Sequence, residues 1–94
     1  MKRIRYTNNN GLLMSNQLYL VEFEGTFVDV QVLLDTQLGT LRLVTEDNDE
    51  LVVLTNVVPS KLKAVAKETL LSMGVQFEDE VRNRLAKVVP EMYV

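Results

Sequence analysis

Three side chains in the first half of the chain have the types that do chemistry when they meet: Glu22, Asp29 and Arg42. Two carboxylates beside a guanidinium perform general acid–base catalysis or hold a polar ligand. Alternation along the predicted strands allows all three to share one sheet face. On an exposed face such groups are usually ordinary solvated charges, so we expect no catalysis from them. If the face holds a small polar ligand, we expect Asp29, Gln31 and Arg42 to contact it.

The chain also lacks the residues on which most enzymes depend. It contains no His and no Cys, which removes the commonest general base, the usual zinc ligands and every thiolate nucleophile. Its four glycines are isolated from one another, so there is no glycine-rich phosphate loop. We therefore expect a protein that is not an enzyme and has no cofactor and no metal.

The acidic run 46–50 superficially resembles a calcium-binding loop. Asp47 and Asp49 alternate as ligands of such a loop would, but Leu51 occupies the next ligand position and no Gly follows. The run is more typical of a solvated turn between two strands.

The charge distribution disfavours nucleic acid as a partner. Net charge is −3, and residues 20–50 carry eight acids and a single base, Arg42. Such a segment repels a phosphate backbone. The basic start of the chain is not followed by the apolar stretch of a signal peptide, and no apolar run is long enough to span a membrane. We expect a cytoplasmic protein with no membrane contact.

Short apolar runs separated by turn residues predict an antiparallel β-meander of four or five strands. The turns lie at Glu24-Gly25, at residues 35–39 and at residues 46–50. Asn10-Gly11 is a suitable turn pair for a further hairpin. The strands are expected near 18–24, 26–34, 40–46 and 51–56, with 2–8 folding against 12–16 in the further hairpin.

The Glu24-Gly25 turn predicts a strand register. A two-residue turn there makes one apolar face, on which Phe23 lies opposite Thr26, Val21 opposite Val28 and Tyr19 opposite Val30. Shifting the turn by one residue would set Glu22 opposite Asp29, and like charges in that position are destabilising. The preferred register therefore pairs, on the second face, Glu22 with Phe27, Leu20 with Asp29 and Leu18 with Gln31.

After Pro59 the apolar period changes to that of a helix. Ser60 is the expected N-cap and Gly74 the expected stop of the first helix, and a second helix is predicted near 77–89. Acidic residues 78–80 at its start disfavour a DNA-binding helix-turn-helix and favour a packed αα-hairpin. We expect Val28, Val30 and Val32 to point toward Val65, Leu70, Val81 and Leu85.

The sequence thus predicts a single α+β domain over 1–94, with the meander in 1–58 and two helices and a tail in 59–94, both helices on one sheet face. The other face would carry Leu18, Leu20, Phe27 and Leu33, which predicts a homodimer or another protein as partner. The expected function is non-catalytic binding, as a regulator, inhibitor or assembly subunit. Small acidic proteins of this kind are often accessory proteins of phages or mobile elements. The alternative is a small-ligand or nucleotide binder with a pocket at an oligomer interface.

Overall fold

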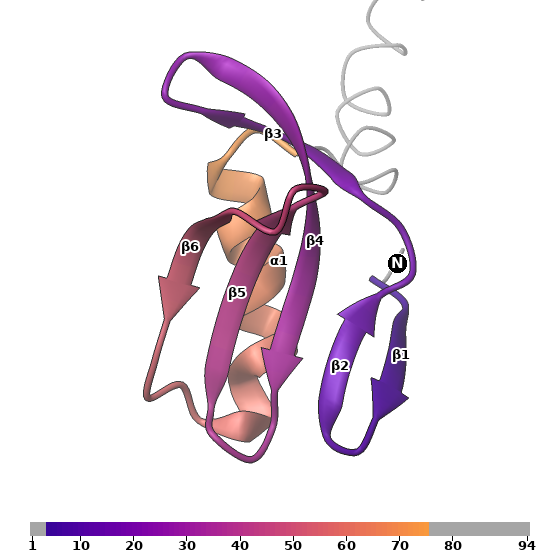
Figure 1. Cartoon of the computed structure of the whole chain (residues 1–94). Helices are drawn as coiled ribbons and strands as arrows, with labels where there is room; N and C mark the ends of the chain where they lie inside the picture. Colours follow the sequence, from indigo (N-terminus) through magenta and orange to yellow (C-terminus); the bar gives the residue numbers. More distant parts are fainter. Residues whose placement is uncertain (1–3, 76–94) are drawn as a thin grey trace, which may run out of the picture.

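A computed structural model describes residues 4–75, which form one antiparallel sheet and one helix (Figure 1). The α+β class is therefore confirmed, but this part of the chain has six strands, where four or five were expected. The predicted second helix, 77–89, lies outside the described residues. The elements in chain order are β1 (Tyr6–Asn9), β2 (Leu12–Ser15), β3 (Tyr19–Phe23), β4 (Thr26–Asp35), β5 (Thr40–Thr45), β6 (Glu50–Leu54), a 3₁₀ turn (Pro59–Lys61) and α1 (Leu62–Ser72).

The long strand β4 organises the sheet. β5 pairs with its residues 30–35 along one edge, and β6 follows outside β5. The other edge is shared, because β3 pairs with residues 26–30 and β2 with residues 33–35. A simple meander is therefore wrong: β2 and β3 are consecutive in the chain but lie end to end along β4 instead of pairing with each other.

Both two-residue hairpins form where the sequence places them. Asn10 and Gly11 have φ angles of 54° and 90°, and Glu24 and Gly25 have 50° and 81°. Two successive positive φ angles are the mark of the type I′ turn, whose twist matches that of paired strands. The predicted register of β3 and β4 is confirmed: Tyr19 lies opposite Val30, Leu20 opposite Asp29, Val21 opposite Val28, Glu22 opposite Phe27 and Phe23 opposite Thr26.

The start of α1 differs from the prediction, whereas its end agrees. Ser60 lies inside the 3₁₀ turn, and neither that turn nor α1 has a side-chain cap. Pro59 explains this, since its fixed φ favours an immediate first turn. At the other end Gly74 has a φ of 91°, and the amide of Val75 donates to the carbonyl of Leu70 at 3.0 Å. This is a Schellman stop. No helix of residues 4–75 is long and apolar enough to cross a membrane.

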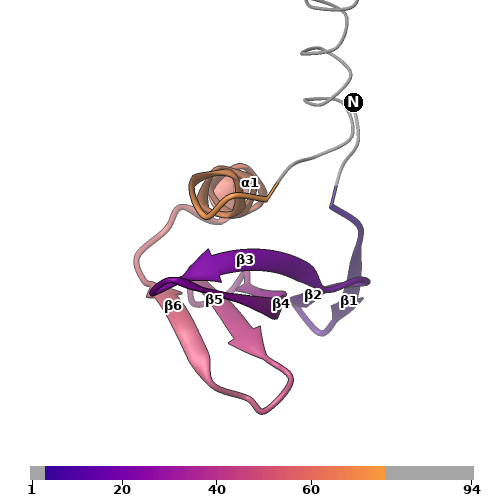
Figure 2. The ribbon, with the colours of Figure 1, turned by 90° about the horizontal axis from the view of Figure 1, so that it is seen from above.

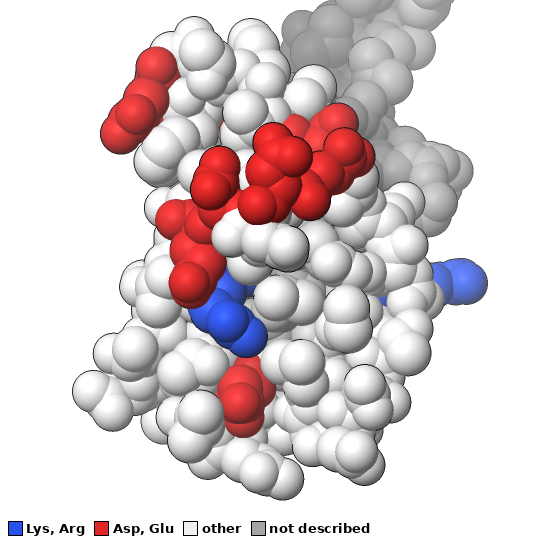
Figure 3. All heavy atoms as spheres, viewed as in Figure 1, with Lys and Arg blue, Asp and Glu red and all other residues white. Residues whose placement is uncertain are grey.

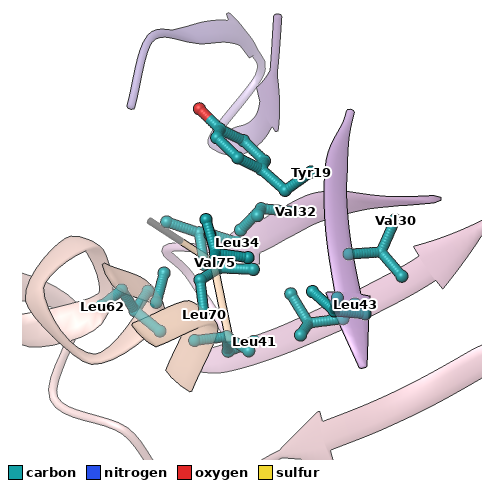
Figure 4. Packing of buried hydrophobic residues seen from close by; sticks show 11 residues of the cluster. Tyr19, Val30, Val32, Leu34, Leu41, Leu43, Leu62, Leu70 and Val75 are labelled. Atoms are coloured by element: carbon teal, nitrogen blue, oxygen red, sulfur yellow. The ribbon is translucent and has the colours of Figure 1, made fainter. Parts of the chain in front are cut away.

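The core lies between α1 and one face of the sheet (Figures 2 and 4). Leu62, Ala66 and Leu70 of α1 are fully or almost fully buried against alternate residues of the central strands. These strand residues are Val30, Val32 and Leu34 of β4 and Leu41 and Leu43 of β5. The predicted facing is confirmed for Val30, Val32 and Leu70, with Val28 and Val65 packed at the margin. Val81 and Leu85 lie outside the described residues.

Candidate functional site

The sheet face turned away from α1 is called here the open face. In Figure 1 this face is seen in front of α1. The register assigns its members because paired residues point to the same side. Val44 belongs to the open face, opposite Gln31, whereas Leu41 lies opposite Leu34 in the core. Its members are Thr7 and Asn9 of β1, Leu12 and Met14 of β2, Leu20 and Glu22 of β3, Phe27, Asp29, Gln31, Leu33 and Asp35 of β4, Thr40, Arg42 and Val44 of β5, and Glu50 and Val53 of β6, with Leu18 just before β3.

Large apolar side chains on the open face are exposed. Phe27 is 68% exposed, Leu20 57% and Leu18 42%, and these three are among the residues that the sequence singles out. Leu33, the fourth, is half-buried between Met14 and Arg42. Val53, 49% exposed, was missed. The unbroken apolar run 51–54 could have indicated it, since such a run places apolar side chains on both faces of a strand.

Acidic side chains gather over one end of the same face (Figure 3). Glu22 and Asp29 lie among the exposed apolar residues of β3 and β4. The turn that joins β5 to β6 bends away from α1, toward the side of the open face (Figure 2), and it contains Glu46, Asp47 and Asp49. Glu50 lies opposite Val44. The acidic residues of the open face are therefore Glu22, Asp29, Asp35 and Glu50, with Glu46, Asp47 and Asp49 in the turn beside them.

The turn at 46–49 has the local bonds of a strand connection. The amide of Asp49 donates to Thr45 Oγ1 at 3.1 Å, and the amide of Asn48 donates to the Thr45 carbonyl at 2.9 Å. Among the described residues, no group of three or more His, Cys, Asp or Glu side chains is placed to hold a metal ion.

The polar residues predicted to contact a ligand share the open face but do not converge. Arg42 lies opposite Leu33, four residues along β4 from Asp29, a distance of about 13 Å at the rise of a strand. Gln31 is engaged, because its Nε2 donates to the Ser15 carbonyl at 3.1 Å. Glu22 is farther still from Arg42, opposite Phe27. The structure therefore does not bring Glu22 and Asp29 together beside the Arg42 guanidinium.

A half-buried tyrosine on the helix side also escaped the sequence analysis. The Tyr6 hydroxyl is buried and has no hydrogen-bond partner among residues 4–75, and burial, with a further contribution from Tyr19, raises its pKa well above the ordinary value. Lys63 Nζ lies 5.9 Å from the centre of the ring. A phenol that keeps its proton cannot act as a base at neutral pH.

Comparison of the chain with protein-family models, curated proteins and solved structures gave no match.

Proposed function

We propose that this protein is a non-catalytic binding protein that docks another polypeptide on its open face. The observation that carries the proposal is the exposure of Phe27, Leu20, Leu18 and Val53 on a sheet face that α1 leaves uncovered. A solvated sheet face normally carries polar residues at these positions. Leu20 and Phe27 are diagonal neighbours across β3 and β4, and large apolar side chains exposed together on one face of a small protein are typical of an interaction site.

A matched pair of variants tests this proposal. Leu20→Ser with Phe27→Ser removes apolar surface from the open face, and Leu38→Ser removes a comparably exposed leucine from the β4–β5 turn. The tagged variants are cross-linked in extract of the native cells, and products are identified by mass spectrometry. We expect a specific product with the wild type and with Leu38→Ser that the double variant loses. Identical products from all three proteins would contradict the proposal.

A second copy of the chain is the alternative occupant that the apolar residues also allow. Two-fold pairing would bury the same patch in both copies and add stability to a short chain. Light scattering over a range of micromolar concentrations measures this directly. A mass that doubles with concentration, and that Leu20→Asp returns to the monomer, would identify a homodimer.

The side chain of Arg42 favours a small anionic ligand as a further candidate for the occupant of the open face. This side chain makes no hydrogen bond or ion pair with any residue of 4–75, and it lies between Leu33 and Val53 on the open face. A thermal-shift screen of nucleotides and carboxylic acids tests this candidate. A ligand whose stabilisation disappears in Arg42→Gln would support it.

A further inference from the structure

Resting on that proposed function, we infer that the occupant of the open face is a basic polypeptide segment, with Lys or Arg among apolar side chains. The inference comes from how apolar and acidic residues are interleaved. Leu20 lies opposite Asp29, and Phe27 lies opposite Glu22. Leu20 and Phe27 therefore each have a carboxylate as the nearest cross-strand neighbour.

This interleaving constrains any partner. A surface that covers Leu20 and Phe27 must also come within contact distance of Asp29 and Glu22. Removing water from an unpaired carboxylate is costly, whereas an ammonium or guanidinium on the partner offsets that cost. Apolar contact and positive charge are thus required of the same partner segment.

The protein does not neutralise these carboxylates itself. The acidic residues of the open face form no ion pair with any residue in the described part of the chain. Arg42 is the one cation that the register places on this face in residues 4–75. Lys61, Lys63 and Lys67 belong to the 3₁₀ turn and α1, across the sheet. Figure 3 shows the resulting imbalance, with a broad acidic area and two small, separate basic areas, one of them at the edge of the view.

The same imbalance disfavours the competing occupants. A two-fold contact that brings the acidic ends of the two open faces together would place carboxylates of one copy against those of the other, with a single Arg42 from each copy to compensate. Nucleic acid would bring phosphates against the carboxylates. A basic polypeptide satisfies both the apolar patch and its charges.

The test uses the full chain and three fluorescent peptides of twelve residues. One alternates Lys with Val and Leu, the second replaces each Lys by Glu, and the third keeps Lys but replaces the apolar residues by Ser. Binding is followed by fluorescence anisotropy at low and high NaCl. We expect the Lys–apolar peptide to bind most tightly, with about tenfold weaker binding at high salt because the charges are screened.

Variants locate the contact. Glu22→Gln with Asp29→Asn should weaken the Lys–apolar peptide about five- to tenfold, and Phe27→Ser should weaken it about tenfold. Glu68→Gln is the matched control, because Glu68 is an exposed residue of α1, on the other side of the sheet, and it should change binding less than twofold. Circular dichroism verifies that each variant is folded.

The outcomes separate this inference from the proposed function. If the Lys and Glu peptides bind equally and Phe27→Ser abolishes both, the inference of a basic partner is wrong, whereas docking on the open face is supported. A homodimer dissociated by Leu20→Asp would replace the basic partner by a second copy. Peptide binding that none of the open-face variants weakens would overturn both. Tight binding of single-stranded oligonucleotide to the open face would likewise overturn the inference.

Discussion

The hydroxyl of Ser15 accepts a hydrogen bond from the amide of Val32 at 3.0 Å and donates one to the carbonyl of Gln17 at 2.9 Å. Ser15 is 3% exposed. The bond from Val32 lies on the shared edge of β4, between the last residue that pairs with β2, Leu33, and the first that pairs with β3, Val30. A buried amide needs an acceptor, and here a side chain supplies the one that a neighbouring strand would otherwise provide.

Ser15→Ala should therefore cost about 1–3 kcal/mol in the free energy of unfolding, because the Val32 amide stays buried without a partner. Urea denaturation measures the change. Ser72→Ala is the control, since Ser72 bonds the Thr69 carbonyl in an exposed position at the end of α1. Equal losses in the free energy of unfolding would show that the buried Ser15 bond stabilises the protein no more than the exposed Ser72 bond does.

Gly39→Ala should destabilise the protein much more than Gly25→Ala. Both residues have positive φ angles, 70° and 81°, so an alanine at either is strained by about 1–2 kcal/mol. A methyl group on Gly39 would also lie 2.4 Å from the carbonyl oxygen of Val57, whereas one on Gly25 meets nothing within 4 Å. Thermal unfolding of the pair checks this, and similar melting temperatures would contradict the packing argument.

Val30→Asp should unfold the protein or cost several kcal/mol, since it buries a carboxylate with no partner in the core. Val53→Asp is the matched control, because Val53 is half exposed on the open face and its carboxylate stays in water. Chemical denaturation followed by circular dichroism measures both. A Val30→Asp protein that unfolds with the wild-type midpoint would refute the assigned facing of β4.

Tyr6→Phe should leave stability at neutral pH unchanged or slightly raised, because the hydroxyl it removes is buried without a partner. Burial raises the pKa of Tyr6 in the folded state, so above about pH 10 the unfolded chain loses this proton first. The stability linked to Tyr6 is thus present below that pH and falls as pH rises. Denaturation between pH 8 and about pH 11 should show a smaller decline in Tyr6→Phe. An identical decline in both proteins would contradict the raised pKa.

Local patterns predicted much of the sheet. The turn pairs Asn10-Gly11 and Glu24-Gly25 located two hairpins, and charge repulsion between Glu22 and Asp29 was enough to select the correct register of β3 and β4. Apolar alternation in β4 assigned its core face, and Gly74 located the end of α1. In each case the deciding interactions join residues that are close in the sequence.

What could not be predicted depends on contacts between distant residues. Leu12 pairs with Asp35, and nothing local indicates that β2 would share an edge of β4 with β3. Ser15 was not singled out, although a serine among apolar strand residues was the available signal. The sequence allowed Glu22, Asp29 and Arg42 to share one face, which they do, but their separation along it required the register of β5, which the sequence left open.

The shared edge of β4 also implies an order of events when the chain folds. Each of the pairs β3–β4, β4–β5 and β5–β6 joins neighbours in sequence and closes a short loop. β2 meets β4 only after residues 15–32 have been enclosed, and it does so through three residues. Because loop closure costs more entropy over longer separations, the β1–β2 hairpin should dock last and detach first. Amide hydrogens at the β2–β4 seam should then exchange with solvent faster than those between β4 and β5.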